Sequence, residues 1–198
     1  MFKAVLWDFG GVISTSPFES FNRYEEANGL PRDFIRTLNA TNPDTNAWAH
    51  FERNEYSVEQ FAKAFAAEAA AQGFELDALA VLGALRGEMR VEVFDMIDAI
   101  NAAGFVNAGV TNNFAPMEPS DWHGKFKVII ESSRVGVRKP DPRFYEMACD
   151  ALGVLPSDCV YLDDLGINLK PAKAMGMTTI KFIDPHDALT ELKGYLGL

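Results

Sequence analysis

Five short, mostly apolar runs constrain the fold of this chain more than any other feature of its sequence. Patterns typical of helices separate most of them; Asp141 and Pro142, for example, open one helical segment and Gly153 closes it. Strands that alternate with helices form a parallel sheet covered on both faces. The sequence therefore predicts an α/β fold. The predicted strands are residues 3–7, 105–110, 127–130, 160–162 and 178–183.

The stretch from about residue 16 to residue 90 departs from this alternation and contains no convincing strand. Ser57 and Gln60 begin and end a capping box that opens a long helix, and the apolar residues that follow fall on one helix face. We therefore expect an all-helical cap, residues 16–90, inserted just after the first strand of a core built from residues 1–15 and 91–198.

The overall charge of the chain argues against some partners. The 198 residues include 18 basic and 28 acidic ones, so the net charge is −10. A field of this sign repels nucleic acid and anionic membranes, and we expect neither as a partner. It also repels a phosphorylated substrate at long range, so any anion site must supply its own local positive charge.

The cysteines and the first residues indicate a cytoplasmic location. Cys149 and Cys159 define no disulfide framework, and buried free thiols in a reducing cytosol are the simplest interpretation. The N-terminal run reaches a charged residue too soon for a signal peptide. No apolar run reaches the roughly 18 residues that a transmembrane helix needs.

Polar side chains follow the predicted strands at the edge where ligands bind in open α/β sheets. Asp8 ends the first strand and precedes a turn at Gly10 and Gly11. At the end of the second strand, the Thr111 hydroxyl and the Asn112 amide can hold the oxygens of an anion. Each signal is also ordinary turn or loop chemistry, so neither is specific when taken alone.

A lysine and an acid pair complete this set. Lys139 precedes Pro140, which keeps it extended and outside the following helix, and its ammonium could offset phosphate charge. Because Lys139 lies in a loop, we expect its loss to damage catalysis far more than folding. Asp163 and Asp164 end the fourth strand. Adjacent carboxylates repel each other, and their oxygen ligands favour Mg²⁺ as the cation that holds them together.

Nucleophile, hydroxyl, lysine and acid pair follow one another in the order found in the haloacid dehalogenase superfamily. Residues 130–140 and 162–172 also resemble the N-terminal phosphatase domain of soluble epoxide hydrolases, and a related N-terminal region of acyl-CoA dehydrogenase-like proteins. The resemblance covers the whole chain and is most specific from Thr111 onward, while the cap matches only in kind. It implies a Rossmann-like, three-layer core, a helical cap and an active site between them.

The resemblance also implies a role for each of these residues. Asp8 would attack phosphorus and form an aspartyl-phosphate, and Lys139 would neutralise charge between the nucleophile and the phosphate. Thr111 and Asn112 would cradle the phosphate oxygens of a small phosphorylated substrate. The implied cofactor is Mg²⁺, held by Asp8, the backbone carbonyl of Gly10 and Asp164, with Asp163 in a supporting or water-mediated position.

Gly10 departs from the family pattern. Most phosphatases of this family carry a second Asp there, two residues after the nucleophile, which protonates the leaving group and later activates water. Gly10 retains a carbonyl for the metal but offers no acid. Glu19 or Glu52 of the cap could replace that acid. Glycine is also expected at this position if the backbone needs a positive φ.

Two other functions stay open at this point. Dehalogenation of a 2-halo acid also uses an aspartyl nucleophile but needs no metal, and those relatives have a serine- and asparagine-rich segment in place of Asp163 and Asp164. A non-catalytic phosphate-binding module is the second alternative, because Gly10 lacks the acid. The nucleophile, hydroxyl, lysine and acid pair are nevertheless all present. We therefore expect a hydrolase of phosphate monoesters.

Overall fold

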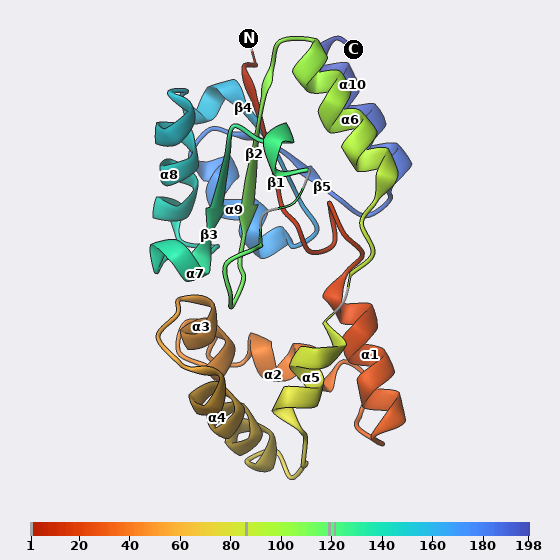
Figure 1. Ribbon diagram of the computed structural model, residues 1–198, viewed down its shortest axis with the longest axis vertical. Helices are drawn as coiled ribbons and strands as arrows, with labels where there is room; N and C mark the ends of the chain where they lie inside the picture. Colours follow the sequence, from red (N-terminus) through yellow and green to blue (C-terminus); the bar gives the residue numbers. More distant parts are fainter. Residues whose placement is uncertain (1, 86, 119, 121) are drawn as a thin grey trace.

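The protein is built around a five-stranded parallel sheet (Figure 1). A computed structural model describes residues 2–85, 87–118, 120 and 122–198. The strand order is β3-β2-β1-β4-β5, so the first strand lies at the centre and pairs with two strands that come later in the chain. The predicted parallel α/β fold is confirmed. The strands are β1 (Ala4–Trp7), β2 (Val106–Thr111), β3 (Val128–Glu131), β4 (Cys159–Asp163) and β5 (Thr178–Lys181).

Alternating side chains of the sheet fill two separate hydrophobic layers. In β1, Val5 and Trp7 pack on one face and Ala4 and Leu6 on the other, and all four are completely buried. Helices cover both faces, which confirms the predicted three-layer core. The covering helices are α6 (Val91–Ala102) and α10 (Pro185–Leu196) on the first face, and α8 (Pro142–Leu152) and α9 (Gly166–Ala174) on the second.

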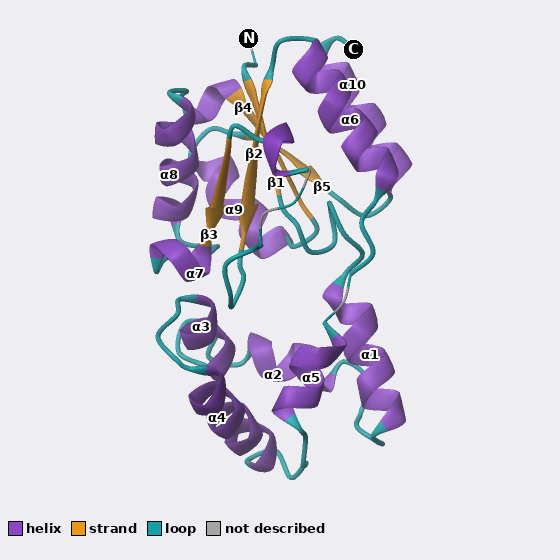
Figure 2. Ribbon diagram, viewed as in Figure 1, coloured by secondary structure: helices purple, strands orange, loops and turns teal. Residues whose placement is uncertain are grey.

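An all-helical part of the chain lies beyond the carboxyl ends of the strands (Figure 2). It has a hydrophobic cluster of its own, in which Trp48 packs against Phe61 and Phe65 with ring centroids 5.0 and 5.8 Å apart. The predicted capping box is present, since Gln60 N–H donates to Ser57 Oγ and Ser57 N–H donates to Gln60 Oε1. These helices are α1 (Pro17–Ala27), α2 (Phe34–Ala40), α3 (Ala47–Glu52), α4 (Val58–Ala70) and α5 (Ala78–Ala84).

Two neighbouring segments connect the helical part to the sheet. Thr15 N–H donates to Glu88 O at 2.9 Å, and Arg90 N–H donates to Ile13 O at 2.8 Å. The same two segments also form an isolated antiparallel bridge. The proposed cap, residues 16–90, begins and ends within this paired region, and its boundaries stay a prediction.

The strand boundaries differ from the predicted ones by one or two residues. β2 continues through Thr111 and β4 through Asp163, because both residues still pair with the neighbouring strand. β5 ends two residues earlier than predicted, and Ile183 beyond it is 78% exposed. The shorter elements are α7 (Ser132–Val135) and the 3-10 turns η1 (His123–Lys125) and η2 (Pro156–Asp158).

Two expectations from composition can be compared with the structure. Cys149 and Cys159 are both buried and free, as predicted. Among the helices formed by the described residues, none combines the length and apolarity that crossing a bilayer requires.

Candidate active site

The carboxyl ends of the central strands bring the predicted site residues together. Because β1, β2 and β4 are parallel neighbours, Asp8, Thr111 and Asp163 lie at one edge of the sheet, which faces the cap (Figure 2). Asp164 follows β4 directly, and Lys139 reaches the same edge from the loop between α7 and α8. Carboxylate oxygens of Asp8, Asp163 and Asp164 lie within 4.8 Å of one another.

The turn after β1 fixes the Asp8 carboxylate. Asp8 N–H donates to Leu162 O at 3.0 Å, which extends the sheet by one residue, and Phe9 N–H donates to Asp8 Oδ1 at 2.7 Å. Gly11 has a φ of +89°, and a Cβ placed there would lie 2.3 Å from Asp164 Oδ2. Glycine is therefore required at Gly11, both for the backbone conformation and for the close approach of the second carboxylate.

Lys139 is buried between two carboxylates. Its Nζ lies 2.7 Å from Asp8 Oδ1 and 2.9 Å from Asp163 Oδ2, and its side chain is 1% exposed. Asn112 holds the Lys139 backbone at two points: Asn112 Nδ2 donates to Lys139 O at 3.0 Å, and Lys139 N–H donates to Asn112 Oδ1 at 2.8 Å. Lys139 is therefore buried and held at several points although it lies in a loop, and the expectation that its loss damages catalysis far more than folding stays a prediction.

Asp163 is engaged by surrounding donors. Its Oδ2 accepts from Lys139 Nζ and from the Tyr161 hydroxyl, and its Oδ1 accepts from Leu165 N–H at 2.8 Å. Asn168 Nδ2 lies 3.1 Å from both oxygens. A carboxylate offers about four lone-pair positions. Although Asp163 lies in the carboxylate cluster, these donors leave it no free position for a metal, and the geometry suits a residue that orients Lys139.

Sequence reasoning missed Tyr161. It precedes Asp163 by two residues on β4, so both side chains project to the same face of the sheet. Its ring lies 5.5 Å from that of Tyr145, whose hydroxyl donates to Asn168 O at 2.7 Å. The period of two along the strand would have identified Tyr161 as a neighbour of the acid pair.

Burial and charge act together on the ionisable groups. Burial raises the pKa of Asp8 well above its ordinary value, and Asp163 adds to the rise while Lys139 opposes it. Burial also raises the pKa of Asp164 to about 6, again with a contribution from Asp163. Burial alone would lower the pKa of Lys139, but the charges of Asp163 and Asp8 raise it, so the lysine is protonated. A divalent cation would reverse the rise at both carboxyl groups, and their oxygen donors fit Mg²⁺.

Three predicted contact residues lie beside this cluster. Thr111 is 5% exposed, and its hydroxyl donates to Asn112 O at 3.4 Å. Both polar atoms of the Asn112 side chain contact the Lys139 backbone, so the side chain holds the lysine rather than facing an anion. Gly10 is not in the left-handed region, and a Cβ there would meet Pro17 Cδ at an ordinary 3.5 Å. The expected need for a positive φ is wrong for Gly10 and holds for Gly11 instead.

Two contacts join the cap to the core beside the site. Arg138 Nε donates to Glu52 Oε2 at 2.6 Å, and Phe51 stacks on Phe114 with ring centroids 5.1 Å apart. Glu52 is therefore engaged in an ion pair, which counts against its use as the replacement acid. Glu19, the other candidate, lies exposed in the first turn of α1.

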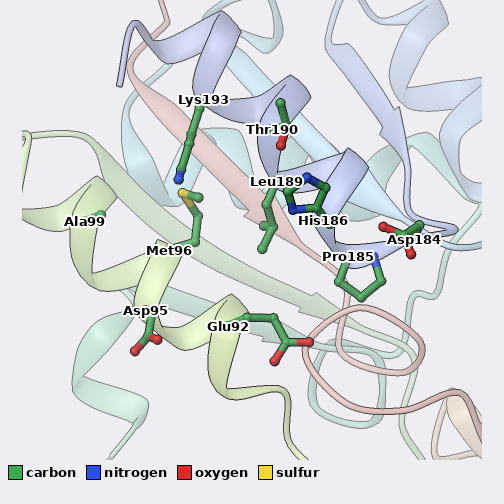
Figure 3. A pocket seen from close by; sticks show the side chains of 10 residues that line it. All are labelled: Glu92, Asp95, Met96, Ala99, Asp184, Pro185, His186, Leu189, Thr190 and Lys193. Carbon is green, nitrogen blue, oxygen red and sulfur yellow. The ribbon is translucent and has the colours of Figure 1, made fainter.

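A surface hollow of about 520 Å³ lies between α6 and α10 (Figure 3). Acidic side chains line it, among them Glu92, Asp95 and Asp184, together with His186 and Lys193. It contains none of the predicted site residues. The chemistry of the strand edge therefore places the candidate active site elsewhere, under the cap.

Comparison with known proteins identifies the class of protein that this fold and site define. A family model described as haloacid dehalogenase-like hydrolase matches residues 2–176. The chain belongs to this family of hydrolases, and the predicted resemblance is confirmed.

Among curated relatives, acyl-CoA dehydrogenase family member 10 of Mus musculus is 33% identical over 99% of this chain and 19% of that protein. Bifunctional epoxide hydrolase 2 of Mus musculus is 28% identical over 98% of this chain and 39% of that protein. A sesquiterpene phosphatase of Aspergillus oryzae is 25% identical over 99% of this chain and 97% of its own length. The chain thus spans about a fifth and two fifths of the first two relatives.

Solved structures share the fold. A HAD-like hydrolase from Porphyromonas gingivalis matches with a TM-score of 0.69 at 22% identity, covering 97% of this chain and 98% of its own. A HAD family enzyme from Bacteroides thetaiotaomicron, an Asp-to-Ala variant in complex with magnesium and inorganic phosphate, matches with a TM-score of 0.64 at 14% identity, covering 91% and 93%. A dehalogenase matches with a TM-score of 0.70 at 17% identity, covering 100% and 98%.

Proposed function

We propose that this chain is a Mg²⁺-dependent phosphatase that hydrolyses a small phosphorylated metabolite through an aspartyl-phosphate on Asp8. The observation that carries the proposal is the position of Asp8, whose Oδ1 lies 2.7 Å from Lys139 Nζ within the carboxylate cluster that includes Asp164. Nucleophile, fixed cation and metal-binding carboxylate are thus close enough to act on one phosphoryl group.

The proposed reaction has two displacement steps. An Asp8 carboxylate oxygen forms a bond to phosphorus as the bond from phosphorus to the ester oxygen breaks, and the leaving oxygen departs with the electron pair. Water then attacks phosphorus, the bond to Asp8 breaks and inorganic phosphate is released. Both steps depend mainly on positioning and on stabilisation of charge.

The residues around Asp8 supply that positioning. Lys139 holds its ammonium beside the attacking carboxylate, and Asp163 fixes the lysine from the other side. The Thr111 hydroxyl and the Asn112 backbone N–H are the proposed donors to the other phosphate oxygens. Asp8, the Gly10 carbonyl and Asp164 would hold Mg²⁺, which offsets the charge of the phosphoryl group when bound.

The acid pair favours this function over metal-free dehalogenation. The pKa values of Asp8 and Asp164 are both raised, so ionising the two carboxyl groups costs free energy unless a cation binds between them. Metal-free dehalogenation makes no use of such a cation. Among the relatives, the sesquiterpene phosphatase and the enzyme solved with magnesium and phosphate support the same choice.

The test is a screen of phosphorylated metabolites with and without Mg²⁺, with release of inorganic phosphate as the readout. We expect turnover only with Mg²⁺, and none from Asp8→Asn, which keeps the shape of the side chain. A folded Asp8→Asn protein with more than a few per cent of the parent activity would remove Asp8 from the proposed role. Metal-independent chloride release from a 2-halo acid would establish a dehalogenase instead.

A further inference from the structure

Arg36 of the cap is an exposed cation that packs on an aromatic ring at the start of α1. It lies on α2, where Phe34, Ile35 and Leu38 face the cap interior and are buried while Arg36 is exposed. Its guanidinium lies over the ring of Phe18, with the carbon at its centre 4.5 Å from the ring centroid. A cation–π contact of this kind restrains the guanidinium and leaves the edge that carries its N–H groups able to bind an anion.

A buried carboxylate holds the N-terminus of α2. Glu25 is 1% exposed and accepts the N–H groups of Asp33 and Ile35, each at 2.8 Å. These two bonds satisfy donors at the start of the helix, and Ile35 directly precedes Arg36. The backbone that carries Arg36 is therefore held in place by hydrogen bonds. Figure 1 places α2 nearer to the core than α4.

A short chain of contacts connects Arg36 to the active-site turn. A Cβ on Gly10 would lie 3.5 Å from Pro17 Cδ, so the start of α1 packs directly over the turn that carries the proposed metal carbonyl. Phe18, the residue after Pro17, is the ring on which Arg36 rests.

The charge of Arg36 is not used by a neighbouring carboxylate. None of the ion pairs formed within the described part of the chain includes it. Arg138, which contacts the cap from the core, is by contrast neutralised by Glu52. In a chain with a net charge of −10, an unneutralised arginine at this position suits an anionic ligand.

We propose that Arg36 binds a second anionic group of the substrate, a carboxylate or a second phosphate, while the first phosphate occupies the site at Asp8. This inference rests on the proposed phosphatase function and narrows it to phosphorylated metabolites with two anionic groups. Arg36 is then the residue of the cap that selects for the distal charge.

The test measures binding without turnover, using benzylphosphonate and (4-carboxybenzyl)phosphonate in the presence of Mg²⁺. The two ligands share a phosphonate and differ only in the distal carboxylate. We expect the parent protein to bind the carboxylated ligand about 10-fold more tightly, as a bidentate charged contact would give. Arg36→Ala should lose this preference and keep its affinity for benzylphosphonate, and Arg36→Lys should keep only part of the preference.

Arg32→Ala is the matched control, because Arg32 is an exposed cap arginine just before α2 and its loss changes the net charge equally. It should keep the preference. Equal affinities of the parent protein for the two ligands, no binding of either, or a preference that survives in Arg36→Ala would each overturn the proposal, as would an equal loss in Arg32→Ala. A parent protein that shows the preference but releases no phosphate from any ester would overturn the phosphatase proposal and leave the anion subsite standing.

Discussion

Lys139 Nζ lies 2.9 Å from Asp163 Oδ2, and neither side chain is more than 1% exposed. Because Asp8 contacts the same ammonium from the other side, one cation serves two carboxylates. Removing it would leave both carboxylates buried without compensation, which typically costs about 3–5 kcal/mol of stability. We therefore expect Lys139 to have a structural role in addition to its proposed catalytic one.

Lys139→Met removes the charge and keeps a similar side-chain length, and adding Asp163→Asn to it separates the two roles. We expect activity to fall on the order of 100-fold, the usual effect of losing one fixed charge at a reaction centre, and the free energy of unfolding to fall as well. Adding Asp163→Asn should recover part of the stability and none of the activity. Denaturant unfolding and phosphate release measure the two effects. An active double variant would mean that Lys139 serves only to neutralise Asp163.

Asp164 gives a prediction about pH and metal. Its pKa is raised from 3.8 to about 6, chiefly by burial, so its protonated form stabilises the fold below about pH 4 and this contribution is lost as the pH rises through about 6. The raised pKa of Asp8 acts in the same direction. The proposed Mg²⁺ would bind the ionised carboxylates, so the increase in melting temperature that it produces should be larger at about pH 8 than at about pH 5.

Asp164→Asn is the control for this effect. The variant should lose most of the Mg²⁺-dependent increase in melting temperature and of its dependence on pH, as followed by thermal unfolding at several pH values. An increase of the same size in the variant and the parent, at every pH, would show that the metal binds elsewhere.

Glu52 gives a prediction about the contact between cap and core. Arg138 contacts both Glu52 and the Pro43 carbonyl, so the ion pair ties α3 and the loop before it to the residue next to Lys139. Glu52→Gln should lower kcat/KM by roughly 3- to 10-fold, the range expected for one weakened charged contact. The dependence of the rate on the leaving group should stay unchanged.

Arg138→Gln is the matched variant, because it breaks the same pair from the other side. The two variants should have similar kinetics with a series of phosphate esters. A steeper dependence on the leaving group in Glu52→Gln alone would identify Glu52 as the missing proton donor.

The fold and the polar centre of the site follow from local patterns. Strand runs, the capping box and the Asp8 turn are all visible within a few neighbouring residues, and parallel strands bring their carboxyl ends to one edge. What the sequence does not predict depends on contacts between distant segments. Asn112 holds the Lys139 backbone across 27 residues, and Arg36 rests on Phe18 through the packing of two cap helices.

The burial of a charged loop residue, Lys139, is a second feature that the local sequence does not predict. A lysine before a proline is usually exposed, and local sequence does not show that two strand ends surround it. The assignment of a special backbone conformation to Gly10 failed for a related reason. The positive φ lies one residue later than expected, at Gly11, which meets the Asp164 carboxylate at the end of a different strand.

Gly10 itself leads to the last prediction. No acid side chain extends from this turn toward the leaving group, and Glu52 is paired with Arg138. The leaving oxygen should therefore depart largely unprotonated or take a proton from water. The rate should then fall steeply as the pKa of the leaving group rises, since each pKa unit represents up to about 1.4 kcal/mol of driving force. Aryl, acyl or anomeric sugar phosphates should react well and simple alkyl phosphates poorly.

Gly10→Asp tests this reading by restoring an acid. Because Gly10 does not have a positive φ and a Cβ there meets Pro17 Cδ at 3.5 Å, we expect the variant to fold with little loss of stability. General acid assistance is worth roughly 100-fold or more when present, so the substitution should flatten the dependence on the leaving group and help alkyl phosphates most. Gly10→Asn, of the same size but without the acid, should keep the steep dependence.

The measurement is kcat/KM for a graded series of phosphate esters under conditions where chemistry limits the rate. A flat profile in the parent protein would contradict the prediction, because a side chain elsewhere in the site would then already be supplying the proton, and the exposed Glu19 of α1 would be the first residue to replace.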